Sequence, residues 1–294
     1  MNCNFPTRAL FTITLPRGGV LRLGERPLVM GILNVTPDSF ADAAPVTGVA
    51  RAIEAALRIQ ADGADLVDIG GESTRPGAEP LPAAEELARV LPVIRGLAGR
   101  LTIPISIDTY KAEVARAALD AGASIVNDVS GLRREAALAH VVAEHGAALV
   151  IMHSRGTPAT MAGEAVYEDV AADVASELQA SIGVAEAAGV PVDRIIVDPG
   201  VGFAKHAAHS YGVLARLPEI VAAVGRPVLV GPSRKSFMRE ALNDRPPAGR
   251  DWGTAAAVTA AVLAGAHLVR VHAVAEMVQV VRVAENIRRH GTDG

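Results

Sequence analysis

Three side chains that carry a carboxylate or an amide each follow a short apolar segment of the chain. They are Asp108, Asn127 and Asp198. A carboxylate can accept two hydrogen bonds from an N–C–N edge, as it does from the fork of an arginine. Together the three groups suit a flat, nitrogen-rich ring, and Lys235 adds a donor for a ring carbonyl or a ring nitrogen.

A second set of residues also follows apolar segments but carries positive charge or hydrogen-bond donors: Asn34, Arg75, Arg270 and His272. Guanidinium forks match phosphate oxygens, so this set suits a phosphate or a diphosphate. Asn34 offers an oxygen to Mg²⁺, which uses few protein ligands when it binds substrate phosphates. Any one of these residues could be only a helix cap or a turn residue. Because all of them follow apolar segments, we favour a site that they share.

The apolar segments alternate with Ala-rich segments of helical period, and several helices end in a glycine turn such as Asp62–Ala64. Nearly continuous apolar runs are typical of parallel strands that are covered on both faces. The alternation predicts an α/β fold, a (β/α)8 TIM barrel, whose chemistry lies at the C-terminal ends of the strands. The predicted strands are Leu28–Leu33, Leu66–Ile69, Ile103–Ile107, Ile125–Val126, Ala148–Met152, Ile195–Val197, Pro227–Val230 and Leu268–Val271.

The predicted helices connect and follow these strands. They are Val49–Ala61, Ala83–Leu97, Ala112–Ala121, Arg134–Glu144, Val166–Ala188, Ser210–Val224, Thr254–Ala264 and Ala273–Arg289. A doubly wound open sheet is the alternative fold. It usually has a Gly-rich dinucleotide turn after its first strand, whereas this chain has Asn34–Asp38 there.

The first part of the chain differs from the repeating pattern. Apolar residues in Phe11–Leu15 and Val20–Leu23 flank the turn Pro16–Gly19, which is typical of a β-hairpin. We therefore expect one domain over residues 1–294, in which residues 1–26 form a hairpin extension that caps one end of the barrel.

Composition excludes several classes of partner. The chain of 294 residues has a net charge of −4 and only 3% aromatic residues, so neither a basic stripe nor an aromatic ladder predicts nucleic-acid binding. The longest Ala/Val run, Ala255–Ala264, is shorter than the roughly 20 residues that a membrane-spanning helix needs. The single cysteine, Cys3, allows no disulfide within the chain and fits a reducing cytoplasm.

Eight motifs together resemble those of the dihydropteroate synthases, a family of pterin-binding barrels. The likeness covers nearly the whole chain after Pro27, and its most specific parts are Glu72–Gly77 and Ser233–Ser236. The motifs are Met30–Phe40, Asp68–Gly77, Ile105–Thr109, Asn127-Asp128, Met152-His153, Asp198–Phe203, Ser233–Ser236 and Arg270–His272.

The resemblance implies a transferase of folate biosynthesis that condenses 6-hydroxymethyl-7,8-dihydropterin diphosphate with 4-aminobenzoate, giving 7,8-dihydropteroate and diphosphate. It implies small-molecule substrates, Mg²⁺ as cofactor, sulfonamides as competitors of aminobenzoate, a homodimer formed through late helices, and a cytoplasmic location. We expect catalysis to depend on Asp108, Lys235, Arg270 and His272.

The resemblance also assigns the binding residues. The pterin is expected on Asp108, Asn127, Met152, Asp198, Phe203 and Lys235. Asn34, Arg75, Arg270 and His272 are expected to hold diphosphate, with Asn34 as the metal ligand. Thr74, Arg75, Pro76, Lys235 and Ser236 are expected to border aminobenzoate.

The chain departs from the family pattern in two places that bear on the site. Ala41–Ala44 replaces a Ser-Asp-Gly-Gly stretch, which restricts the backbone of the first loop because two glycines are lost. Ala273 replaces an aspartate that could cap the last helix or orient His272.

Three other functions share some of these features. A methyltransferase that passes a methyl group from a folate to a cobalamin protein would use the same ring pocket, but it has no need of Arg75, Lys235 and Arg270 around a diphosphate. A non-catalytic pterin-binding paralogue is supported only by Ala273 and the altered first loop. A Schiff-base aldolase would use Lys235, which instead lies several residues beyond its strand.

Overall fold

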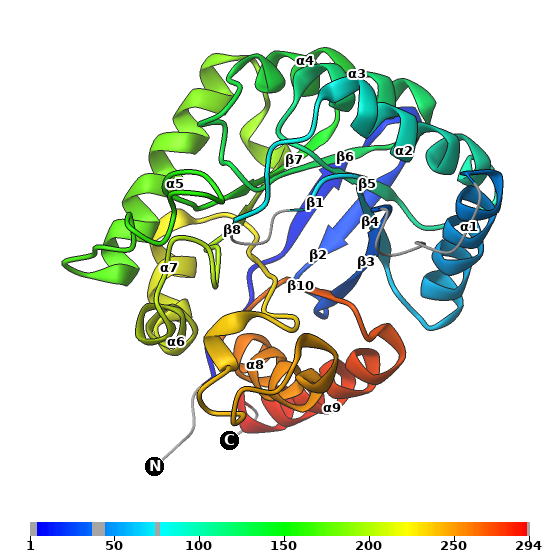
Figure 1. Cartoon of the computed structure of the whole chain (residues 1–294). Helices are drawn as coiled ribbons and strands as arrows, with labels where there is room; N and C mark the ends of the chain where they lie inside the picture. The colour runs from blue at the N-terminus through cyan, green and yellow to red at the C-terminus, as the bar shows by residue number, and fades with distance from the viewer. Residues whose placement is uncertain (1–4, 37–44, 74–76, 293–294) are drawn as a thin grey trace.

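The computed structural model describes residues 5–36, 45–73 and 77–292. Parallel strands form a ring that helices surround (Figure 1). The strand order is β8-β7-β6-β5-β4-β3-β10-β9, and a parallel bridge between Val197 and Val228 joins β8 to the segment before β9. The strands are β3 Leu28–Asn34, β4 Leu66–Gly70, β5 Ile105–Asp108, β6 Ile125–Asp128, β7 Ala148–Met152, β8 Ile195–Asp198, β9 Leu229–Val230 and β10 Leu268–Val271.

The predicted (β/α)8 fold is confirmed, because each strand pairs in parallel with the next repeat and the last strands pair with the first. No helix among the described residues is long and apolar enough to cross a membrane. The helices are α1 Pro45–Ala61, α2 Ala83–Leu97, α3 Ala112–Ala121, α4 Ala137–His145, α5 Val170–Ala187, α6 Ala207–Ala215, α7 Leu217–Val224, α8 Asp251–Leu263 and α9 Val274–Thr292.

Several predicted elements begin or end at other residues in the structure, and three of them do so for local reasons. The predicted helix Ser210–Val224 is wrong as a single helix, because Pro218 lacks the N–H that would continue α6 and instead stands in the first turn of α7. The helix predicted from Val166 begins at Val170, since the side chain of Asp169 caps it by accepting from two backbone N–H groups. The strand predicted from Ile103 begins after Pro104.

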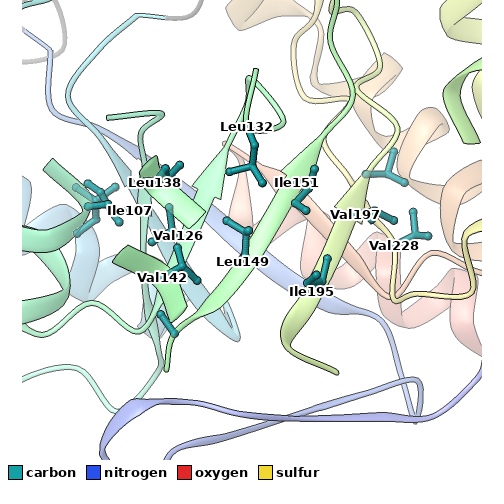
Figure 2. Close-up of a cluster of buried hydrophobic side chains, with 14 of the residues drawn as sticks. Ile107, Val126, Leu132, Leu138, Val142, Leu149, Ile151, Ile195, Val197 and Val228 are labelled. Carbon is teal, nitrogen blue, oxygen red and sulfur yellow. The ribbon is translucent and has the colours of Figure 1, made fainter. Parts of the chain in front are cut away.

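Alternate residues of each strand face opposite sides of the sheet, which gives the core two layers. Outward residues such as Ile107, Val126 and Leu149 pack against surrounding helices, including Leu138 and Val142 of α4 (Figure 2). Inward residues fill the lower part of the barrel together with the hairpin. Those from the strands are Leu28, Met30, Leu66, Ile125, Ala148, Val150, Ile196, Leu229 and Leu268.

The N-terminal hairpin pairs β1, Phe11–Thr14, with β2, Val20–Leu23, in antiparallel register. Its buried side chains, Ile13 and Leu23 among them, pack on the inward residues at the N-terminal ends of the barrel strands. Arg17 in the turn donates 2.7 Å to the carbonyl of Ala123, just before β6. The hairpin therefore lies at the end of the barrel opposite the C-terminal ends of the strands.

Candidate active site

The strand period that fills the lower barrel with apolar residues also places polar residues at its mouth. Two positions after inward Leu66, Ile125, Ile196 and Leu268 stand Asp68, Asn127, Asp198 and Arg270. Because side chains two apart on a strand share a face, all four point to the barrel axis. The inward positions of the strands thus continue from the core into the mouth, where they carry polar instead of apolar side chains.

Arg270 on β10 links its own strand to two other strands of the barrel. Its Nε donates 2.6 Å to Oδ2 of Asp68 on β4, and its Nη2 donates 2.7 Å to Oδ2 of Asp108 on β5. Asn127 on β6 donates 2.9 Å to the same Oδ2 of Asp68. One cation, two carboxylates and one amide therefore form a continuous network across the barrel mouth.

Burial sets the charge state of this network. It raises the pKa of Asp108 to about 7, although the positive charge of Arg270 opposes the shift. Burial also raises the pKa of Asp198, against the attraction of Lys235. It lowers the pKa of the Lys235 ammonium to about 8, against the attraction of Asp198. The site thus contains an acid, Asp108, and a base, Lys235, that change charge near neutral pH, as active-site groups often do.

Lys235 and Asp198 converge with Arg270 at a position that has no side chain of its own. A Cβ atom at Gly231 would lie 3.6 Å from Cβ of Arg270, 3.7 Å from Oδ2 of Asp198 and 3.9 Å from Nζ of Lys235. Nζ of Lys235 donates 2.6 Å to the carbonyl of Val201 and lies 4.4 Å from the centroid of the Phe203 ring. The loop after β8 therefore brings a carboxylate, an aromatic face and an ammonium together.

His272, which follows β10, is oriented by Ser233. The hydroxyl of Ser233 accepts from the backbone N–H of His272 at 3.1 Å and lies 2.9 Å from its Nδ1. Because the hydroxyl hydrogen is then free to donate to Nδ1, the imidazole keeps Nε2 as its own donor. Ser233 thus supplies an orienting partner of the kind that Ala273 does not provide.

Asn34 ends β3 with its side chain half-buried, and its amide makes no hydrogen bond to the residues that the structure describes. The described residues hold no cluster of three or more His, Cys, Asp or Glu side chains that could bind a metal ion by themselves. One amide oxygen therefore fits a Mg²⁺ ion whose other ligands come from a phosphorylated substrate and water. This donor set does not fit a metal held only by protein.

The remaining predicted residues have different environments. Met152 is buried at the end of β7, whereas Ser236 is exposed at the start of a short 3₁₀ helix, Ser236–Met238. Thr74, Arg75 and Pro76, and the loop Ala41–Ala44, lie outside the described residues.

The segment that precedes Thr74 is held firmly. Glu72 contacts the ammonium of Lys111 and accepts from the Tyr110 hydroxyl at 3.3 Å. Lys111 also contacts Glu86 of α2, and Arg89 of α2 donates 2.8 Å to the carbonyl of Gly71. These contacts fix the point at which the chain leaves β4.

Three residues that belong to this site were not predicted from the sequence. Asp68 is fully buried and holds both Arg270 and Asn127. His153 and Lys205 are buried beside the loop after β8, with Nζ of Lys205 2.8 Å from Nδ1 of His153. An aspartate within an otherwise apolar strand was the available signal for Asp68. The pairing of His153 with Lys205 has no local sequence signal.

Comparison with known proteins agrees with this architecture. Residues 30–272 match the model of the family "pterin binding enzyme". The dihydropteroate synthase of Synechocystis sp. is 46% identical over 280 residues, which cover 95% of this chain and 96% of that protein. The solved dihydropteroate synthase of Xanthomonas albilineans with 4-aminobenzoic acid is 42% identical and covers 94% of this chain and 99% of its own, with a TM-score of 0.85.

A third relative is the solved dihydropteroate synthase of Yersinia pestis with a sulfonamide drug. It is 40% identical, has a TM-score of 0.88, and covers 95% of this chain and all (100%) of its own. The chain therefore belongs to the pterin-binding enzymes. Within that family it belongs to the dihydropteroate synthases, which are transferases of folate biosynthesis.

Proposed function

We propose that this chain joins 6-hydroxymethyl-7,8-dihydropterin diphosphate to 4-aminobenzoate and releases 7,8-dihydropteroate and diphosphate. The observation that carries the proposal is the position of Arg270 between Asp68 and Asp108 at the barrel mouth. A ring with an N–C–N edge satisfies the carboxylates, and a diphosphate on its methylene group satisfies the arginine. One ligand with both parts matches both halves of the network.

The reaction breaks the bond between the pterin methylene carbon and the diphosphate oxygen, which leaves with the electron pair. The electron-rich dihydropterin delocalises the resulting positive charge, and ionised Asp108 stabilises that charge as it develops. The nitrogen of the neutral aryl amine then forms the new bond to the methylene carbon and loses its proton to water. Because the amine is already neutral near pH 7, no strong general base is required.

Residues on the other side of the mouth act on the leaving group. Arg270, Arg75 and the Nε2–H of His272 donate to diphosphate oxygens and so balance the charge that accumulates on them. Asn34 would hold Mg²⁺, which supplies charge neutralisation to the diphosphate when it is bound. Thr74, Pro76, Lys235 and Ser236 border the aminobenzoate.

Turnover of the defined substrates tests the proposal. The protein is incubated with the pterin diphosphate, 4-aminobenzoate and Mg²⁺, and the release of diphosphate and the formation of dihydropteroate are measured together. Equal amounts of both products are expected. Diphosphate release without dihydropteroate would indicate hydrolysis, and tight binding of the pterin diphosphate with no product would indicate a non-catalytic binding protein.

The same assay tests the second substrate. Sulfonamides resemble aminobenzoate in size and in their aryl amine, so we expect inhibition that rising aminobenzoate relieves. Inhibition that added aminobenzoate does not change would place the drug elsewhere.

We further propose a cytoplasmic homodimer that forms through the late helices. Helices α8 and α9 pack on each other and leave large apolar side chains in solvent, with Trp252 88%, Val283 60% and Ile287 50% exposed. Large apolar side chains that are exposed on two neighbouring helices favour association with a second copy. Light scattering should give twice the 30.3 kDa of one chain, and Val283→Glu should give one chain mass. The mass of one chain for the unchanged protein would contradict the proposed dimer.

A further inference from the structure

A buried lysine that the proposed mechanism does not use lies directly behind the loop that carries Asp198. The side chain of Lys205 is buried, and its Nζ lies 2.8 Å from Nδ1 of His153 and donates 3.2 Å to the carbonyl of Phe203. Among the described residues, no carboxylate lies within ion-pair distance of this ammonium. A buried charge without a close counterion is costly, so its retention calls for a role.

The loop from Asp198 to Lys205 folds back tightly on the end of β7. The backbone N–H of His153 donates 2.8 Å to the carbonyl of Asp198, and Gly200 N–H donates 2.7 Å to the Asp198 carboxylate. Gly200 has a φ of +68°, and a Cβ there would lie 1.9 Å from the carbonyl of His153 and 3.4 Å from Nζ of Lys205. The ammonium is therefore on the inner side of the turn that orients Asp198.

His153 fixes the direction in which Lys205 can donate. Burial lowers the pKa of His153 to about 4, so its imidazole is neutral at pH 7. Nε2 lies 3.3 Å from a carboxylate oxygen of Glu177, at ion-pair distance but without hydrogen-bond alignment. Because the negative carboxylate favours an N–H that faces it, the ring proton belongs on Nε2. Arg133 and Arg155 hold Glu177 from the solvent side. Nδ1 is then an acceptor, and Lys205 must be its donor.

We propose that Lys205 is a positioning residue for the pterin substrate, which holds Phe203 and supplies positive charge behind Asp198. The proposal rests on the proposed function, because it assigns Asp198 and Phe203 to the pterin. From its place behind the turn, Lys205 acts through these two residues and does not contact the ring. Loss of Lys205 should therefore weaken the binding of the pterin diphosphate and leave the binding of aminobenzoate unchanged.

The test compares the two substrates in Lys205→Met and Lys205→Gln. Lys205→Met removes the charge and the donors, and we expect the KM for the pterin diphosphate to rise about tenfold while the KM for aminobenzoate stays within about twofold. Lys205→Gln keeps an N–H donor without the charge, so we expect the same selectivity with a smaller rise. It also provides a measurable protein if the methionine variant folds poorly.

A matched control is Arg8→Met, which removes a buried cation at the other end of the barrel, where Arg8 contacts Glu285 over 2.9 Å. It should lower the unfolding temperature and leave both KM values unchanged. A stability loss in both Lys205 variants with unchanged KM values, or an equal rise in both KM values, would overturn the positioning role. Absence of turnover in the unchanged protein would instead overturn the proposed function.

Discussion

Arg270 and Asp108 are joined by a 2.7 Å hydrogen bond that crosses the mouth of the barrel from β10 to β5. Arg270 is also the partner of Asp68, so its guanidinium is held on two sides. A pterin ring that takes Asp108 and a diphosphate that takes Arg270 would replace this one contact with two. Before substrate binds, each of the two residues therefore has the other as its partner. Both side chains already face the space in which the two ends of the same ligand would bind.

The first prediction concerns Asp108→Asn. The amide cannot stabilise positive charge on the pterin, so kcat should fall by about 10²- to 10³-fold. Stability should change by less than about 1 kcal/mol, because the substitution removes a buried charge while Asp68 continues to hold Arg270. Turnover and urea unfolding of the same preparation measure the two effects. A collapse of stability that parallels the loss of activity would make Asp108 a structural residue.

The second prediction is a narrow pH optimum. Asp108 acts as the anion and its pKa is about 7, so kcat/KM for the pterin diphosphate should rise as the pH increases through 7. Lys235 acts as the cation and its pKa is about 8, so kcat/KM should fall as the pH increases through 8. The rising limb should be absent from Asp108→Asn, and Lys235→Arg should move the falling limb to higher pH. A profile that is flat from pH 6 to 9 would contradict both assignments.

The third prediction concerns Asp68, which touches both halves of the network. Its Oδ2 accepts from Arg270 and from Asn127, so Asp68→Asn weakens two contacts that orient ligand-binding groups. We expect kcat/KM for the pterin diphosphate to fall at least about tenfold, since one misplaced charged contact costs about 1.5–3 kcal/mol. The KM for aminobenzoate should stay within twofold. Equal losses for both substrates would indicate a general distortion of the barrel.

Much of this architecture could be predicted because short stretches of the sequence encode it. An apolar strand, its polar C-terminal end and the glycine turn that precedes the next strand are each read from a few adjacent residues. The polar ends correctly indicated where the network lies. The break between α6 and α7 was also local, at Pro218, but helical periodicity on both sides of it concealed the boundary.

The contacts inside the site could not be predicted in the same way. Arg270 and Asp68 are 202 positions apart, and Lys205 and His153 are 52 apart. Which residues meet depends on barrel closure and on the register between strands. Sequence patterns therefore assigned Arg270 to an anion, whereas the structure shows that it also contacts Asp108, a carboxylate expected to bind the ring.

The last prediction concerns acid stability and depends on His267, beneath the barrel. Val228 N–H donates 3.1 Å to Nδ1 of His267, and Nε2 lies 3.1 Å from the carbonyl of Ala9, so the buried ring is neutral and both nitrogens are used. Protonating Nδ1 would place its N–H directly against the backbone N–H of Val228. Burial accordingly lowers its pKa from 6.5 to about 4. The unfolded chain takes up this proton at higher pH than the folded chain, so stability is complete above pH 6.5 and is lost as the pH falls from 6.5 to 4.

Between pH 7 and pH 5 this one group should remove about 2 kcal/mol from the free energy of unfolding. Urea unfolding at the two pH values measures the loss, and His267→Gln should reduce it by about that amount. His140 is exposed on α4, so His140→Gln is the matched control and should leave the loss unchanged. If His267→Gln loses as much stability as the unchanged protein, His267 is protonated in the fold, and the hairpin must tolerate a charge that its two contacts argue against.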